Sequence, residues 1–336
     1  MHERLSRAMA ITRTEIDYLA ASYEGDELLL ATWIAQSDQR LTSSRRFQLV
    51  RLNDNKTIIK RLINTAKVEG LKSVILSFFP HPRMVLQKDS NIKLINTIKE
   101  RHDILDDLGL DYLLIKKFTI EFSRLSAEDF VKDILVDKIN AKKVIIGYDH
   151  RFGRNRNADI NDLKIFGEKY GFDVEEISAQ DINDVAVSST KIRAALHEGN
   201  IQKANMYLGY NFMLEGQVAK GRGLGKALDY PTANIEIDED YKIVPKQGSY
   251  IVRSFINDSM VYGMMNIGMN PTVNGQKQTI EVHFLDFDKD IYGESIKIEL
   301  LQRLRDEEKF ESIDALKAQL AIDKQITLDY ITNHHD

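Results

Sequence analysis

The chain has 336 residues, which suggests two domains and a remainder at about 100–200 residues per domain. Its 43% hydrophobic and 29% charged residues indicate a globular chain, and its formal charge of −5 gives no general attraction to nucleic acid or acidic membranes. The absence of cysteine excludes disulfides, thiolate nucleophiles and cysteine-based zinc sites. No apolar run approaches the ~18 residues of a membrane span, and the first ten residues are too polar for a signal peptide. We therefore expect a cytoplasmic protein without nucleic-acid or membrane partners; these numbers leave its oligomeric state open.

Residues 1–55 have the pattern of a short antiparallel β meander. The strand-like runs are residues 8–18, 27–36 and 44–52. They are separated by Gly25-Asp26 and by a polar cluster, as strands joined by turns are. A meander of this size is too small to bury both faces by itself, and it contains no catalytic constellation.

A helix is predicted to start at Thr57 and to stop at Gly70. Apolar residues recur at helical spacing along one face of it. A helix of this kind usually follows a tight turn that contains glycine. The preceding residues 52–56 (LNDNK) contain none, so the front of this element looks incomplete.

Residues 56–186 alternate between predicted strands and helices. The short apolar runs are residues 73–79, 112–118 and 144–147, and the predicted helices are residues 92–108 and 126–140. Ser126 and Asp129 come close to a capping box at the start of the second helix. Strand–helix repetition predicts a doubly wound α/β sheet, whose ligands bind beyond the carboxyl ends of the strands. The polar stretches at 80–83 (PHPR) and 148–159 are therefore candidate binding segments.

Residues 210–324 contain short strands with closely spaced turn signals, which predicts a small antiparallel β-barrel. A closing helix is expected over residues 313–323. We expect this barrel to bring its own core and to fold alone from about residue 208 onward.

The string GRGLGKALDYPTANI has the chemistry of a phosphate site. Its glycines permit a close backbone approach to a phosphate chain; they are Gly221, Gly223 and Gly225. Lys226 adds positive charge, and Thr232 and Asn234 offer oxygen ligands on one strand face. Such ligands suit Mg²⁺ held together with substrate phosphates. By loop composition alone, an ordinary glycine-rich hairpin is an equally good interpretation.

Glu281 and His283 alternate with apolar residues on another predicted strand, so one face of that strand carries a carboxylate and an imidazole. A carboxylate near a phosphate loop could take a proton from an attacking hydroxyl. For a lone glutamate, a solvated strand face is the commoner interpretation.

The string SSTKIR places Ser189 and Thr190 at a helix start, followed closely by Arg193. Free N–H groups and a cation at such a start attract anions. As a lone motif it would more often be a plain helix cap.

Residues 210–324 resemble riboflavin kinase through the glycine loop, PTAN, the NIG-x-NPT turn, the IEVHFLDF strand and LR-x-E-x-KF, all in order. The resemblance implies ATP and riboflavin as substrates, with Thr232 and Asn234 as the magnesium and phosphate residues. It also implies Glu281 as the catalytic base and Arg305 near the flavin. Asp229 stands where this family commonly has glycine, and we expect it to weaken ATP binding.

The middle stretch resembles the FMN adenylyltransferase domain of bacterial bifunctional flavin enzymes, which has a nucleotidyltransferase-like, Rossmann-like α/β fold. FFPHPRMVL, IIGYDHRFGRNRNADI and VSSTKIRAALHEGN carry this resemblance. It implies that the flavin or its nucleotide is held by Asp149, Phe152 and Arg154. It also implies that Ser189, Thr190 and Arg193 belong to the adenylyltransferase site. Ala158 stands where the family usually has glycine.

In that family the first strand ends in a G-x-F-D-G-x-H-x-G-H string immediately before the first helix. No H-x-G-H occurs in this chain, so the resemblance implies an α/β domain that is incomplete at its front. Residues 1–55 look instead like part of a hot-dog-fold acyl-CoA thioesterase. The expected domains are a thioesterase-like fragment at 1–55, an adenylyltransferase-like domain at 56–209 and a kinase barrel at 210–336.

The predicted function is flavin cofactor biosynthesis: riboflavin is phosphorylated by ATP to FMN with Mg²⁺. The resemblance implies a second activity, adenylylation of FMN to FAD, and the absent histidines argue against it, so we expect no detectable FAD formation. Two alternatives stay open from the sequence. One is a flavin- or nucleotide-binding protein without turnover, and the other is an acyl-CoA thioesterase carried by residues 1–55.

Overall fold

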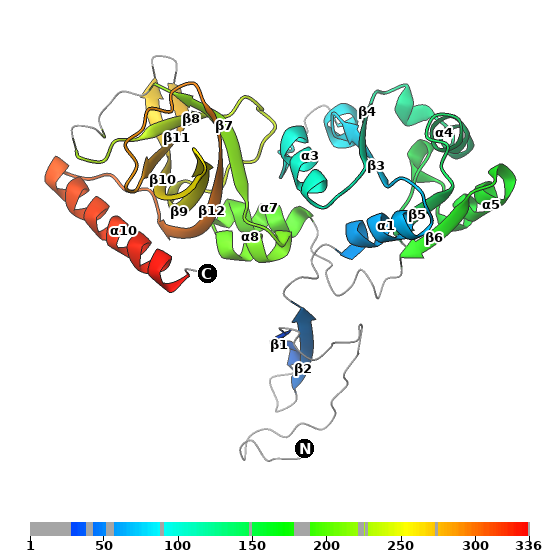
Figure 1. Ribbon diagram of the computed structural model, residues 1–336, viewed down its shortest axis with the longest axis horizontal. Helices are drawn as coiled ribbons and strands as arrows, with labels where there is room; N and C mark the ends of the chain where they lie inside the picture. Colours follow the sequence, from blue (N-terminus) through cyan, green and yellow to red (C-terminus); the bar gives the residue numbers. More distant parts are fainter. Residues whose placement is uncertain are drawn as a thin grey trace, which may run out of the picture. The chain divides into compact units, whose positions relative to one another are not determined.

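The computed structural model describes residues 28–37, 43–51, 57–87, 91–147, 150–177, 189–220, 225, 228–272 and 275–334. The chain forms two compact units, each built from two segments. Figure 1 labels the helices and strands of the chain. The first unit comprises Met1–Leu71 and Ser123–Ala186, and the second comprises Lys72–Phe122 and Val187–Asp336. The stretch predicted as one α/β domain therefore contributes to both units, and the unit boundaries differ from those predicted at 56 and 210.

The N-terminal part contains a β-hairpin of β1 (Leu28–Ser37) and β2 (Ser43–Arg51). The two strands pair antiparallel, and the register shifts between Ile34 and Gln36. This agrees with the strand-like runs predicted at 27–36 and 44–52. The run predicted at 8–18 lies outside the described residues.

The first unit contains one parallel strand pair, β5 (Lys143–Gly147) with β6 (Asp173–Ile177). Its helices are α1 (Thr57–Val68), α4 (Ala127–Phe130) continuing into the π-helix η3 (Val131–Val136), the 3₁₀ turn η4 (Arg154–Arg156) and α5 (Ile160–Tyr170). Ser126 caps α4 by accepting a hydrogen bond from the backbone N–H of Asp129, as predicted. Gly70 has a left-handed φ of 67°, which explains why the first helix stops there.

The second unit begins with another parallel pair, β3 (Val74–Phe79) with β4 (Tyr112–Lys117), as predicted. Between them lie α2 (Pro82–Leu86) and α3 (Ile98–Asp107), and the 3₁₀ turn η2 (Phe122–Arg124) follows where the chain passes from this segment to the first unit. The helix predicted from residue 92 begins only at Ile98. A capping box between Thr97 and Glu100 sets that start, and Leu94 instead forms a parallel bridge with Lys242.

The remainder of the second unit is the predicted antiparallel barrel. Its strands are β7 (Met213–Ala219), β8 (Ala233–Glu236), β9 (Gly248–Ile256), β10 (Ser259–Thr272), β11 (Gly275–Phe284) and β12 (Ser295–Arg305). They close in the order β10-β11-β8-β7-β12-β9, with every neighbouring pair antiparallel. Closure leaves no strand edge unpaired, which is how a small barrel of this kind avoids edge-to-edge association.

The core of the barrel is completed by segments that are not part of the barrel. These segments include α7 (Ser189–Glu198) and α8 (Ile201–Leu208). Their buried residues in the barrel's core cluster, together with one from the segment before α3, are Ile95, Ile192, Ala195, Leu196, Ile201 and Ala204. The expectation that a barrel starting near residue 208 brings its whole core is therefore wrong.

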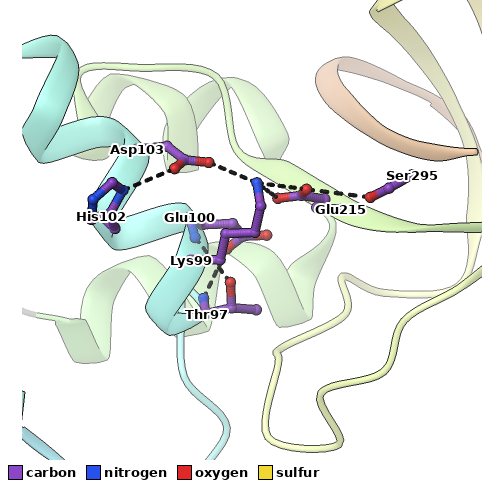
Figure 2. Close-up of polar contacts among 7 residues, drawn as sticks. All are labelled: Thr97, Lys99, Glu100, His102, Asp103, Glu215 and Ser295. Atoms are coloured by element: carbon purple, nitrogen blue, oxygen red, sulfur yellow. Dashed lines mark hydrogen bonds and ion pairs between the residues drawn. The ribbon is translucent and has the colours of Figure 1, made fainter.

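Polar contacts also fix α3 to the barrel (Figure 2). Lys99 Nζ lies 2.9 Å from Asp103 Oδ2 and 2.8 Å from Glu215 Oε1 on β7. Glu215 in turn accepts a hydrogen bond from Ser295 on β12, at 3.4 Å. The hydrogen bond to Glu215 and that to Asp103 raise the pKa of Lys99. A helix from the region predicted as adenylyltransferase thus belongs to the same compact unit as the barrel.

The C-terminal helix α10 (Ile313–Asn333) begins where predicted, with Ser312 as its N-cap, and continues ten residues past the predicted end. Asp323, the predicted last residue, lies in the middle of the helix, where it is buried and forms an ion pair with Arg305 on β12. In the described part of the chain, no helix is long and apolar enough to cross a membrane.

Candidate functional site

One lateral row of residues runs across neighbouring barrel strands and contains three of the residues selected from the sequence. In the strand registers, Asn234 lies opposite Glu281 and Glu281 opposite Asn266. Asn266 lies opposite Ser249, which lies opposite Arg305. Residues directly opposite each other in antiparallel strands project to the same side of the sheet. The barrel therefore gathers five polar residues into one row.

This row faces the outside of the barrel. Ile280 and Val282, the neighbours of Glu281 on β11, are buried in the barrel core. Because side chains alternate along a strand, Glu281 projects to the opposite, outer side, where it is half-buried. The sequence selected Asn234, Glu281 and Arg305 but missed Asn266 and Ser249, because only the register connects those two residues to the others.

Thr232 joins this row from the segment just before β8. Its Oγ1 donates a hydrogen bond to Glu281 Oε2 at 3.2 Å. Thr232 and Asn234 therefore meet Glu281, which lies about fifty residues later in the sequence. A hydroxyl, an amide and a carboxylate side by side can together contact a phosphate, a metal ion and a reacting hydroxyl.

Gly225 packs against the segment that carries Thr232. A Cβ atom at this position would lie 2.3 Å from the carbonyl oxygen of Tyr230 and 3.2 Å from Thr232 Oγ1. The carbonyl of Gly225 accepts hydrogen bonds from the N–H groups of Leu228, at 3.1 Å, and Tyr230, at 2.9 Å. Only glycine fits here without displacing the backbone. Gly221, Gly223 and Lys226 lie outside the described residues.

Asp229, which replaces the glycine common in the resembling family, has a φ of 64°. This left-handed conformation favours glycine, and aspartate is among the few other residues that tolerate it. Its side chain is 89% exposed, and its Oδ2 lies 3.6 Å from Lys317 Nζ on α10. The carboxylate is therefore directed to solvent and a lysine; its expected effect on ATP binding stays a prediction.

Arg305, the residue expected near the flavin, is held by Asp323 of α10. Its Nε lies 3.0 Å and its Nη2 2.9 Å from Asp323 Oδ2. The Asp323 side chain is almost completely buried and also accepts a hydrogen bond from Gln319. This two-point ion pair attaches α10 to the end of β12. Arg305 lies in the polar row, and its contact with a flavin stays a prediction.

The oxygen atoms at this site suit a magnesium ion. Within the described residues there is no group of three or more His, Cys, Asp or Glu side chains that could hold a metal ion by themselves. Thr232 Oγ1 and the Asn234 amide oxygen are hard oxygen donors of the kind Mg²⁺ takes. Mg²⁺ typically uses few protein ligands and completes its shell with substrate phosphates and water, so this donor set fits.

A second group of candidate residues forms a cationic cluster in the same unit, beyond the end of β3. His81 is the N-cap of α2. Burial is the main cause that lowers the pKa of His81, and the positive charges of Arg193, Arg83 and Arg101 lower it further. Arg193 Nε donates to the Lys93 carbonyl at 2.9 Å, which fixes this guanidinium. Several positive charges around a helix start suit an anionic ligand. The sequence selected Arg193 and the PHPR stretch; it missed Arg101, which lies on α3.

Ser189 and Thr190 are exposed at the start of α7 in this unit, as predicted from SSTKIR. The other predicted adenylyltransferase residues belong to the first unit. Asp149 lies outside the described residues, and Arg154 is exposed.

Phe152 is only 8% exposed and packs in the core of the first unit, with its ring centroid 6.0 Å from that of Phe130. It also forms an antiparallel bridge with Ala158, whose methyl group is buried beside it. The flavin contact predicted for Phe152 stays a prediction.

Two family models match the chain. The riboflavin kinase model matches residues 208–331, and the FAD synthetase model matches residues 55–191. The bifunctional riboflavin kinase/FMN adenylyltransferase of Listeria monocytogenes is 34% identical over 284 residues, which cover 84% of this chain and 90% of the relative. That of Escherichia coli K12 is 33% identical over 271 residues, covering 80% and 86%. A Streptococcus pneumoniae crystal structure, titled as a macrolide-efflux protein, is 30% identical with a TM-score of 0.73, covering 82% of this chain and 90% of that one.

Proposed function

The chain belongs to the family of bifunctional riboflavin kinase/FMN adenylyltransferases, and we propose that the polar row on the outer face of the barrel is its riboflavin kinase site. The chain is thus an enzyme of flavin biosynthesis that uses ATP and riboflavin or FMN as substrates. The alternatives considered from the sequence, a binding protein without turnover and an acyl-CoA thioesterase, receive no support from the comparisons.

The observation that carries this assignment is the meeting of Thr232, Asn234 and Glu281. The Thr232 hydroxyl lies 3.2 Å from the Glu281 carboxylate, and Asn234 is the register partner of Glu281 on β8. A Cβ atom at Gly225 would lie 3.2 Å from Thr232 Oγ1, so Gly225 and the Glu281 carboxylate belong to one site. Phosphoryl transfer needs little more from a protein than positioning and charge stabilisation, and this arrangement supplies both.

In the proposed reaction, Glu281 accepts the proton of the ribityl 5′-hydroxyl as that oxygen attacks the γ-phosphorus of ATP. The bond from the γ-phosphorus to the bridging oxygen breaks, and FMN and ADP are formed. The Thr232 hydroxyl and the Asn234 amide hold the phosphate end of ATP beside the carboxylate. The same oxygens would hold Mg²⁺, which would supply neutralisation of the negative charge on the phosphates. Glu281 is half-buried, so it is accessible to a substrate hydroxyl.

The cationic cluster of His81, Arg83, Arg101 and Arg193 supports a second, separate proposal, that it binds the phosphates of the adenylyltransferase substrates. The charges of Arg193, Arg83 and Arg101 each lower the pKa of His81, and the Arg193 guanidinium is held by the Lys93 carbonyl. Ser189 and Thr190 add N–H and hydroxyl donors at the start of α7.

The kinase site is tested by Glu281→Gln, which keeps size and hydrogen-bonding capacity and removes the base. We expect kcat for FMN formation to fall by about 10²–10⁴-fold, the usual contribution of a general base. Riboflavin affinity, measured by quenching of flavin fluorescence, should be largely kept. Glu168→Gln is the matched control, because Glu168 is exposed on α5 in the other unit and should leave both quantities unchanged. FMN formation by Glu281→Gln at the parent rate would identify Glu281 as an ordinary solvated strand residue.

A further inference from the structure

His283 lies two residues after Glu281 on β11 and therefore on the same outer face of the barrel. Its Nδ1 lies 2.9 Å from the carbonyl oxygen of Pro231. A carbonyl oxygen can only accept a hydrogen bond, so Nδ1 carries the proton and donates. The imidazole thus reaches from the strand of the proposed base to the residue immediately before Thr232.

The ring of His283 is also fixed by packing. It meets the ring of Tyr230 edge to face, with the centroids 5.1 Å apart and the planes at 69°. Burial lowers the pKa of His283, the hydrogen bond to Pro231 opposes this shift, and Lys324 on α10 lowers the pKa further. The neutral ring with its proton on Nδ1 and the protonated ring can both donate this hydrogen bond.

The segment from Tyr230 to Thr232 is held at both ends. At one end, the N–H of Tyr230 donates to the carbonyl of Gly225 at 2.9 Å. At the other, His283 binds the carbonyl of Pro231, and the next residue, Thr232, donates to Glu281. Pro231 has no N–H with which to anchor itself, so its carbonyl is the backbone group available for fixing this turn.

We propose that His283 is a positioning residue of the kinase site, which holds the Pro231 carbonyl so that the Thr232 hydroxyl stays beside the Glu281 carboxylate. The proposal rests on the proposed function of Thr232 and Glu281. His283 takes no proton from substrate and contacts no phosphate; it sets the distance between the phosphate-holding residue and the base. Its loss should therefore affect the use of ATP and the chemical step more than the binding of riboflavin.

The test compares two variants of nearly equal size in the full chain. In His283→Asn, the side-chain Nδ2 occupies nearly the place of the imidazole Nδ1 and can donate to Pro231. In His283→Leu, a methyl group occupies that place. Both variants lose the ring contact with Tyr230, so they should lose similar thermal stability. Only the leucine variant also loses the hydrogen bond.

We expect His283→Leu to lower kcat/KM for MgATP by about three- to ten-fold relative to His283→Asn, the fold-change that corresponds to one hydrogen bond. The KM for riboflavin should be the same in both variants. If the leucine variant is insoluble, His283→Gln replaces it, because its amide lies one bond farther out and misses the Pro231 carbonyl. The same loss relative to the asparagine variant is then expected.

Equal kcat/KM for MgATP in His283→Asn and in the leucine or glutamine variant compared with it would overturn the proposal. This holds whether both variants match the parent or both fall together. A loss confined to the KM for riboflavin would overturn it as well. Failure of the proposed function is recognised separately, by parent-rate turnover of Glu281→Gln. A slow Glu281→Gln with equal His283 variants would leave the kinase site in place and remove only the role of His283.

Discussion

Lys242 and Glu100 form an ion pair whose side chains are almost completely withdrawn from solvent, with 1% and 0% exposed. Lys242 Nζ lies 2.5 Å from Glu100 Oε2 and 2.7 Å from the Ile95 carbonyl, and 4.5 Å from the centre of the Phe212 ring. Burial lowers the pKa of Lys242 and raises that of Glu100, and the attraction between the two charges opposes both shifts. The pair joins α3 to the barrel, so either charge alone would be buried without its partner.

We expect Lys242→Met to destabilise the protein by about 3–5 kcal/mol, because it leaves the Glu100 carboxylate buried without a counter-charge. The double variant Lys242→Met with Glu100→Leu should recover most of this loss, since no charge then remains in the apolar site. Both values are read from urea unfolding followed by circular dichroism.

Lys99→Met is the matched control for this measurement. Lys99 on α3 also pairs with the barrel, through Glu215 (Figure 2). Its side chain, however, is 62% exposed. The control should cost only about 0–1 kcal/mol. A Lys242→Met variant no less stable than Lys99→Met would show that the buried pair is not needed to hold α3 against the barrel.

At the scale of elements, helices α7 and α8 and the segment before α3 behave as parts of the barrel's core. Leu196 on α7 and Ile201 on α8 are completely buried in the same cluster as the inward-facing residues of the strands. Helices that precede the barrel in the chain therefore cover part of its apolar surface. A fragment cut at the start of β7 would expose that surface to water.

We predict the order of stability full chain, then Val187–Asp336, then residues 208–336. The shortest fragment loses the contacts of Ile192, Leu196 and Ile201, each worth about 1.5–3 kcal/mol of burial. The middle fragment keeps them but lacks Glu100, so Lys242 is left unpaired. Midpoints of thermal inactivation of riboflavin phosphorylation give the comparison. A fragment 208–336 as heat-resistant as the full chain would contradict this account of the core.

At the scale of the whole molecule, the described α/β strands form two separate parallel pairs. β3 pairs with β4 in one unit and β5 pairs with β6 in the other, and no described strand joins the pairs. Parallel sheets are normally larger and covered on both faces, and two-stranded sheets are marginal by themselves. The expected loss of the first strand and its H-x-G-H string is consistent with this division; β2, which precedes α1, pairs with β1.

We therefore predict that the chain forms FMN from riboflavin, ATP and Mg²⁺ without detectable FAD. Adenylyl transfer requires charge stabilisation of the leaving pyrophosphate, which the absent histidines would have provided. The products of one incubation are separated by chromatography. A variant with a strand and G-x-F-D-G-x-H-x-G-H inserted ahead of Thr57 should gain FAD synthesis through Ser189, Thr190 and Arg193. FAD formation by the unmodified chain at a rate comparable with FMN formation would refute this prediction.

Much of the local structure followed from the sequence because its causes lie within a few residues. The cap at Ser126, the start of the closing helix at Ile313, the helix stop at Gly70 and the alternating strands of the barrel each depend on neighbours along the chain. The same holds for the site motifs, since Thr232 comes directly before the short strand that carries Asn234, and Glu281 and His283 share another strand. Short-range patterns of this kind indicate which element forms and which side chains share a face.

What only the tertiary structure decided is which distant elements meet, because that depends on register and packing between segments far apart in the chain. Closure of the barrel placed Asn266 and Ser249 in a row with Glu281 and brought His283 to Pro231. Packing buried Phe152 in a core and held Arg305 against Asp323. It also placed α3 in the second unit, where Glu100 on α3 pairs with Lys242, which is far away in sequence. Such pairings are selected by the summed free energy of the whole fold and not by any single stretch of residues.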